Sequence, residues 1–192
     1  MNNIEKFQSV MLSNCFDSST NSIAALFKNL DISTCHEKNI WFYADIQSNQ
    51  VGTSEKTIDF NLDEMVKGTG YIYVCRIYDD ELTIDPIIKN YFDSFIQEAS
   101  QIQNIKSIQL FIMNNIEVLE HTDSDNLQVQ RALFPIEVPD STANNLIFKI
   151  EKNEIIPTPE EVISFSGAVM HSAWNYTSKD WKFLSVDFYN KT

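Results

Sequence analysis

Residues 116–123, Ile-Glu-Val-Leu-Glu-His-Thr-Asp, contain the pattern on which our interpretation of this chain rests. The apolar residues that precede His121 indicate a strand. In an extended segment, side chains two residues apart point to the same face, so His121 and Asp123 share one. His171 follows about fifty residues later and is one of only three histidines in the chain. Two imidazoles and one carboxylate can bind one face of a metal ion and leave further coordination positions open. The pattern therefore predicts a metal site formed by His121, Asp123 and His171.

The composition is that of a single globular domain spanning residues 1–192, with 43% hydrophobic residues and a large aromatic content typical of sheet-rich proteins. The chain has 27 acidic and 14 basic side chains, which gives a formal net charge of −13. Such a surface repels phosphate backbones and acidic membrane surfaces. We therefore expect no nucleic-acid partner and no membrane partner.

The N-terminal residues lack a basic segment followed by an apolar run, so they do not resemble a secretory signal. No stretch approaches the roughly 18 apolar residues that a membrane-spanning helix needs. Cys15, Cys35 and Cys75 show no CxxC spacing and are interpreted as reduced thiols of a cytoplasmic protein. A zinc site that includes Cys35 and His36 is disfavoured, because adjacent residues rarely suit one tetrahedral ion.

The first half of the chain combines helices and strands. Residues 22–30 have apolar positions at helical spacing, and residues 85–103 carry the longest apolar stripe, with Pro86 in the first turn. Aromatic, β-branched or alternating segments predict strands at 39–46, 56–62 and 71–78. Between the last two, residues 62–66 suggest a helical turn that ends at Gly68-Thr69-Gly70.

After residue 103 the sequence consists of short apolar or alternating segments that predict strands only. Turn signals separate most of them, among them Asn114-Asn115, and the predicted strands cover residues 106–113, 116–123, 131–138, 145–151, 160–167, 168–175 and 181–189. Short strands at such intervals are typical of antiparallel sandwiches and barrels, including jelly rolls. We expect an α+β, mostly β fold in which residues 104–192 form the metal-binding core. Residues 1–103 then support its sheet with helices and strands.

Two other interpretations of the motif have to be weighed. A His-x-Asp tripeptide occurs by chance in many proteins, and a lone histidine at a strand end is usually a hydrogen-bonded structural residue. The acidic run that begins at Asp123 also invites a calcium loop, but Gln128 and Phe134 occupy the positions that need glycine and glutamate. The weight of the metal prediction therefore comes from the second histidine, the strand-rich context and a nearby arginine.

Residues 119–188 resemble the catalytic core of Fe(II)- and 2-oxoglutarate-dependent oxygenases. The resemblance is greatest to the branch of aspartyl/asparaginyl β-hydroxylases and bacterial proline hydroxylases. It rests on four short stretches, which are His121-Thr122-Asp123, Arg131-Ala132-Leu133-Phe134-Pro135, His171-Ser172-Ala173-Trp174-Asn175 and Leu184-Ser185-Val186-Asp187-Phe188. The resemblance implies a double-stranded β-helix, also called a jelly roll.

The resemblance further implies that His121, Asp123 and His171 bind Fe(II). Arg131 would contact a carboxylate of the cosubstrate 2-oxoglutarate, a role suited to a planar fork of donors. A second basic anchor is expected about ten residues after His171. Trp181 occupies that position and Lys182 follows it, so Lys182 is the candidate, although a one-residue shift in a strand reverses the facing of a side chain. Leu133 replaces a histidine of the family pattern.

The activity implied is hydroxylation of an amino acid, a peptide side chain or a related small molecule, with dioxygen as the oxidant. Retention of the carboxylate at Asp123 favours hydroxylation over halogenation. Two alternatives stay open at this level. The first is a jelly-roll ligand-binding or structural protein without catalysis, and the second is a cupin-like metal enzyme that does not use 2-oxoglutarate.

Overall fold

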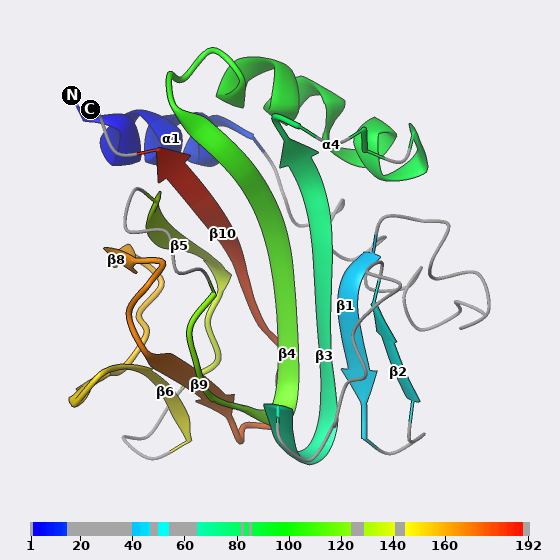
Figure 1. Cartoon of the computed structure of the whole chain (residues 1–192), viewed down its shortest axis with the longest axis vertical. Helices are drawn as coiled ribbons and strands as arrows, with labels where there is room; N and C mark the ends of the chain where they lie inside the picture. Colours follow the sequence, from blue (N-terminus) through cyan, green and yellow to red (C-terminus); the bar gives the residue numbers. More distant parts are fainter. Residues whose placement is uncertain are drawn as a thin grey trace.

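The structure is a computed structural model, and it describes residues 2–14, 40–46, 50–53, 65–81, 83–84, 86–123, 129–140 and 145–189. The predicted helix at 22–30 and the predicted strand at 56–62 lie outside these residues, as do Cys15, Cys35 and His36. Within them, strands dominate (Figure 1).

The elements follow the order expected from the sequence, and both helices of the described residues end before residue 100. They are α1 (Asn3–Ser13), β1 (Ile40–Asp45), β2 (Gln50–Thr53), β3 (Val66–Asp79), α4 (Pro86–Ala99), β4 (Ile105–His121), β5 (Val129–Glu137), β6 (Leu146–Ile150), β7 (Asn153–Ile155), β8 (Ile163–Ser166), β9 (His171–Asn175) and β10 (Trp181–Tyr189). The predicted helix 85–103 is therefore shorter than expected and stops at Ala99. Ser13 Oγ and Asn14 Nδ2 both donate to Oε2 of Glu98, each at 3.5 Å, which ties the end of α1 to the end of α4.

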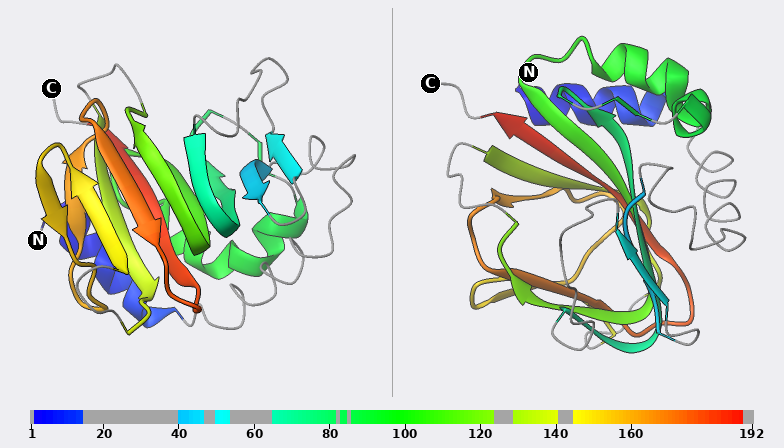
Figure 2. Two further views of the ribbon diagram at one scale, coloured as in Figure 1. Left: turned by 90° about the horizontal axis from the view of Figure 1, so that it is seen from below. Right: turned by 45° about the vertical axis from the view of Figure 1, so that its right-hand side comes forward.

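The sheet is a double-stranded β-helix, because strand β4 belongs to both of its layers. Its first part, 105–113, pairs with β10 in a larger layer of order β2-β1-β3-β4-β10-β5-β8. Its last part, 116–121, pairs with β9, which continues through β6 to β7 in the smaller layer. All of these pairings are antiparallel, and the curl of the sheet is visible in Figure 2. The predicted mostly β jelly roll is confirmed.

The bend in β4 corrects two predictions. Asn114-Asn115 is not a turn between two strands, since β4 continues through it, and Asn115 has a positive φ of 45°. Strand β3 follows the bend and starts at Val66, so Gly68-Thr69-Gly70, where the predicted helical turn was expected to end, is strand. Gly68 has a φ of 129°, and a Cβ on Gly70 would overlap the carbonyl oxygen of Asn114. These glycines allow the two backbones to approach at the bend.

Two apolar cores lie on the two faces of the larger layer. The outer core is covered by α1 and α4, and Phe7 of α1 packs against Phe95, Phe134 and Phe188. The inner core lies between the two layers of the jelly roll and includes Phe148, Phe165 and Phe183. Along β10, residues 184, 186 and 188 contribute to the outer core, whereas residues 181 and 183 contribute to the inner core. This alternation decides which side chains can reach the interior.

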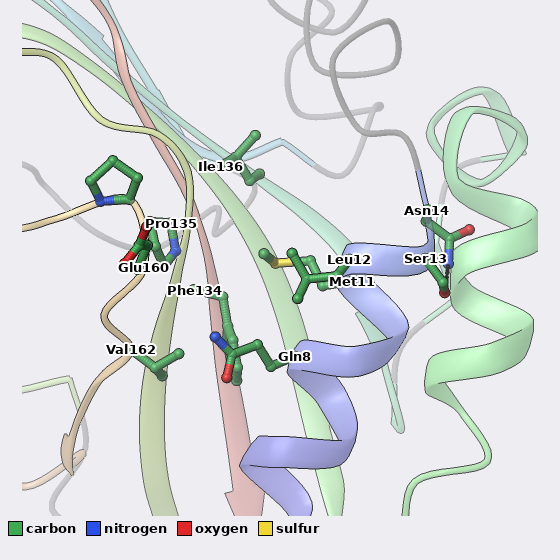
Figure 3. A pocket seen from close by; sticks show the side chains of 11 residues that line it. Gln8, Met11, Leu12, Ser13, Asn14, Phe134, Pro135, Ile136, Glu160 and Val162 are labelled. Carbon is green, nitrogen blue, oxygen red and sulfur yellow. Dashed lines mark hydrogen bonds between the residues drawn. The ribbon is translucent and has the colours of Figure 1, made fainter.

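An open cleft of about 550 Å³ lies on the outer side, between the C-terminal half of α1, strand β5 and the segment that links β7 to β8 (Figure 3). Its walls include Met11, Leu12, Phe134 and Val162, and Glu160 is the acidic side chain among the residues that line it. The cleft is on the opposite face of the sheet from the predicted metal site. Among the described residues, neither helix has the length and hydropathy required to cross a bilayer.

Candidate metal centre

His121 and His171 meet where the two layers of the jelly roll separate. His121 is the last residue of β4, His171 is the first residue of β9, and the two are directly paired in the β4–β9 register. Their ring centroids lie 4.5 Å apart. The alternative of a ligand-binding or structural protein predicts that the two histidines lie far apart or are hydrogen-bonded elsewhere, and the structure brings them together.

The strand predicted over residues 168–175 begins later than expected, because β9 starts at His171. Strand β8 stops at Ser166, and the chain turns back through residues 167–170 before β9 begins. Two backbone hydrogen bonds close this turn, from Gly167 N–H to the Val129 carbonyl and from Val169 N–H to the Ser166 carbonyl. The turn places the imidazole of His171 at the mouth of the jelly roll.

Both imidazoles are held in the same way by the backbone. Nδ1 of His121 lies 2.7 Å from the carbonyl oxygen of Leu119, and Nδ1 of His171 lies 2.9 Å from the carbonyl oxygen of Val169. A carbonyl can only accept a hydrogen bond, so each Nδ1 carries a proton and each Nε2 faces Asp123, to which it donates when it is protonated as well. The form with a proton on Nδ1 alone presents a bare Nε2. This is the tautomer that binds a metal through Nε2, fixed by a second hydrogen bond as in known metal sites.

Asp123 completes the group two residues beyond the end of β4. Its Oδ1 lies 3.4 Å from Nε2 of His121, and its Oδ2 lies 3.0 Å from Nε2 of His171. One ligand atom from each of the three residues falls within 4.8 Å of the others. Two nitrogen donors and one carboxylate around a common point make a facial donor set suited to a divalent first-row metal ion. The residues present therefore fit such an ion.

The protonation equilibria of this group are strongly coupled. Burial by itself lowers the pKa of His121, but the hydrogen bond and the negative charge of Asp123 outweigh burial and raise it. Burial would raise the pKa of Asp123, yet hydrogen bonds from both histidines and the charge of Arg131 hold it well below its usual range. Asp123 is therefore ionised at neutral pH, as a metal ligand must be.

Arg131 lies beside the three residues but is already engaged by two carboxylates. Its Nε–H donates to Oδ1 of Asp187 at 2.7 Å and its Nη2 donates to Oδ2 at 2.9 Å. Its Nη1 donates to Oδ2 of Asp123. Burial alone would lower the pKa of Arg131, but the hydrogen bonds and charges of Asp187 and Asp123 raise it, so the guanidinium stays charged.

Lys182 is not brought to the metal centre. It lies on the outer face of β10, where its neighbours 184 and 186 enter the outer core, and its Nζ donates to Oε2 of Glu137 at 2.7 Å. The preceding Trp181 faces the interior, and its buried Nε1 has no hydrogen-bond partner. The pairing of β10 with β5 is irregular at this point, but the extra residue is Ile136 of β5, and the pairing with β4 is regular. Trp181 and Phe183 both contribute to the inner core, so Lys182 between them faces the other way.

A small apolar cavity of about 50 Å³ lies behind the three residues. Side chains of the inner core form most of its wall, and the polar residues that line it are His121, Asp123, Arg131, His171 and Ser185. The stacked rings of Phe111 and Phe183, with centroids 4.9 Å apart, form part of this wall. Leu133, which replaces a histidine of the family pattern, is another wall residue.

Asp187, Ser107 and Asn175 had no role assigned from the sequence. Asp187 is 7% exposed and holds Arg131, and Ser107 Oγ in turn donates to Oδ2 of Asp187 at 3.1 Å. The final Val-Asp of the family pattern pointed to Asp187 but not to its partner. Asn175 is structural, since its Nδ2 donates to the carbonyl oxygens of Met113 and Lys179. These bonds hold the connection between β9 and β10.

No protein-family model matches this sequence, and no curated protein is significantly similar to it. Solved structures with a similar arrangement of strands include a predicted oxalate decarboxylase from Thermotoga maritima, with 11% identity over 64% of this chain and 84% of that chain, and a TM-score of 0.43. A protein of the 2OG-Fe(II) oxygenase family from Burkholderia pseudomallei has 17% identity over 62% of this chain and 68% of that chain, with a TM-score of 0.44. A prolyl-4-hydroxylase from Pseudomonas putida has 12% identity over 63% of this chain and 73% of that chain, with a TM-score of 0.38. These similarities do not bear on the activity of the chain.

Proposed function

We propose that this chain is an Fe(II)- and 2-oxoglutarate-dependent dioxygenase that hydroxylates an amino acid, a peptide side chain or a related small molecule. The observation that carries the proposal is the arrangement of His121, Asp123 and His171. Both imidazoles are fixed by their Nδ1 contacts, and both Nε2 atoms converge on one ionised carboxylate at the mouth of a jelly roll.

Each residue of the centre has a definite task in this proposal. His121, His171 and Asp123 hold the metal on one face and leave the other face open to ligands. An Fe(II) ion bound there would supply the oxidative chemistry, in which dioxygen is the oxidant: one oxygen atom enters succinate as 2-oxoglutarate loses CO2, and the other enters the substrate as a hydroxyl group. Arginine has five N–H donors, and three of those of Arg131 are used by Asp187 and Asp123, so two are left for a ligand carboxylate. The apolar wall of the cavity keeps water away from the reacting atoms.

One observation favours a second candidate, a cupin-like metal enzyme that does not use 2-oxoglutarate. The cavity behind the centre is small, about 50 Å³, and Arg131 is the only cationic side chain among the described residues that line it. A dicarboxylate would have to share Arg131 with two protein carboxylates. A smaller metal ligand would not have to share Arg131 in this way.

The test is turnover of 2-oxoglutarate by the purified protein loaded with Fe(II). We expect succinate release that depends on iron and oxygen and increases with amino-acid or peptide candidates. His171→Ala serves as the inactive control, because it removes one nitrogen donor. Binding of a divalent metal is measured in parallel by isothermal titration calorimetry.

The two measurements together separate the candidates. Metal binding that is lost in His171→Ala, without any succinate release or any binding of 2-oxoglutarate, would favour the cupin-like enzyme. A wild-type protein that binds neither Fe(II) nor 2-oxoglutarate would refute both.

A further inference from the structure

The buried carboxylate of Asp187 faces the metal centre without belonging to it. It is not one of the three residues whose ligand atoms converge, and its two oxygens are occupied by Arg131 and Ser107. We infer that Asp187 is a positioning residue for metal binding, which holds Arg131 in place and neutralises it so that Asp123 stays available to the metal ion. This inference rests on the proposed metal site.

The geometry of the sheet creates this arrangement. Asp187 of β10 is directly paired with Arg131 of β5 on one side and with Ser107 of β4 on the other. The three residues therefore form a polar row across three neighbouring strands of the larger layer. Asp123 lies at the end of this row, next to Arg131. The order of contacts is Ser107 to Asp187, Asp187 to Arg131, and Arg131 to Asp123.

The charges explain why a second carboxylate is useful. A single guanidinium beside Asp123 would neutralise that carboxylate and compete with a metal ion for its oxygens. In the structure Arg131 is shared between two carboxylates, and Asp187 takes the bidentate contact through Nε and Nη2. Two carboxylates and one guanidinium leave the group with one excess negative charge. That charge favours a divalent cation at Asp123.

A purely structural role for Asp187 makes a different prediction. A buried ion pair that only supports the fold affects stability when it is broken, but it leaves the affinity of the folded protein for metal unchanged. A positioning role lowers metal affinity in variants that are still folded. Groups that support a metal ligand typically change metal affinity by about 10–100-fold when they are altered.

The experiment measures the dissociation constant of Co²⁺ alone, by calorimetry and by the visible absorption of the bound ion, with folding checked by circular dichroism. In Asp187→Asn we expect affinity to fall by about tenfold or more. In Ser107→Ala, which removes one hydrogen bond to Asp187, we expect a smaller fall of about threefold. Ser107→Ala keeps the test decisive if Asp187→Asn does not fold.

The matched control is Asp180→Asn. Asp180 also accepts two hydrogen bonds between elements of the fold, from Tyr71 Oη at 2.6 Å and from Asn114 Nδ2 at 2.9 Å, but it lies outside the metal cavity. We expect Asp180→Asn to bind Co²⁺ as the wild type does. A general loss of stability would affect both asparagine variants.

A double substitution tests whether Asp187 acts through Arg131. In a protein that already carries Arg131→Gln, Asp187→Asn should cause little further change in Co²⁺ affinity, because the positive charge that Asp187 neutralises has been removed. Wild-type affinity in both folded Asp187→Asn and Ser107→Ala would overturn the inference while leaving the metal site intact. Absence of Co²⁺ binding in the wild type would refute the metal site itself.

Discussion

His121 and His171 are directly paired residues of neighbouring strands, and each points Nδ1 at the carbonyl oxygen two residues before it in the chain. The symmetry of these contacts turns both Nε2 atoms toward Asp123. A rigid pair of this kind does not have to reorganise when a metal ion binds, which favours binding.

Removal of the carboxylate of the centre should abolish tight metal binding. We expect Asp123→Ala to weaken Co²⁺ or Fe(II) binding by more than about 100-fold. Loss of a group that only supports a ligand usually weakens metal binding by about 10–100-fold, and loss of a ligand itself should exceed this range. Glu120→Ala is the matched control, since Glu120 is a neighbouring carboxylate that pairs with Lys149 at 3.5 Å instead. Calorimetric titration of both variants checks this, and equal affinities would contradict the assignment of Asp123.

Substitutions of Lys182 and of Arg131 should differ in their effect on the affinity for 2-oxoglutarate. Lys182→Met is expected to leave the apparent affinity for 2-oxoglutarate unchanged, because Lys182 faces outward and pairs with Glu137. Arg131→Met is expected to lower this affinity by at least about tenfold, because it removes the cation that lines the cavity. The KM for 2-oxoglutarate measures both effects. A large rise of KM in Lys182→Met would restore the role expected from the sequence.

The bend in β4 should depend on Gly70. An added Cβ would overlap the carbonyl oxygen of Asn114, so the backbone has to move, and we expect Gly70→Ala to lower the free energy of unfolding by about 2–4 kcal/mol. Gly167→Ala is the control, since its Cβ would meet its nearest neighbour at 3.7 Å, an ordinary contact. Urea unfolding of the two variants measures the difference. Equal losses of stability would show that the close approach at Gly70 is not the cause.

Stability should fall at alkaline pH in a way that depends on Tyr73. Burial raises the pKa of Tyr73 to about 12, and the charges of Asp45 and Asp180 add to the shift. Because the pKa in the folded state is raised, its stabilising contribution is complete below about pH 10, where tyrosine ionises in the unfolded chain. The contribution is lost as the pH rises from there through about 12.

Unfolding curves between pH 8 and pH 11 are the measurement for this prediction. The free energy of unfolding of Tyr73→Phe should fall less steeply above pH 10 than that of the wild type. Parallel slopes for the two proteins would contradict the assignment of the shift to Tyr73.

Much of the secondary structure and the residues of the candidate site could be predicted from the sequence, because these features depend on local sequence patterns. Alternation in segments such as 181–189 predicted strands, the stripe in 85–103 predicted a helix, and the spacing in His121-Thr122-Asp123 placed two side chains on one face. These inferences depend on the geometry of a single element. They needed no knowledge of which elements become neighbours.

Other features depend on pairing between distant segments, and only the tertiary structure decided them. The Asn114-Asn115 pair looks like a turn, but β3 and β9 hold it inside one bent strand. The facing of Lys182 follows from the register of β10, in which one residue separates the interior from the outer face. The row from Ser107 through Asp187 to Arg131 depends on β10, because Asp187 lies 80 residues after Ser107 and 56 residues after Arg131. The sequence by itself determined the residue types of the candidate metal centre, whereas the tertiary structure determined which charges lie beside them, because cross-strand register is a property of the whole sheet.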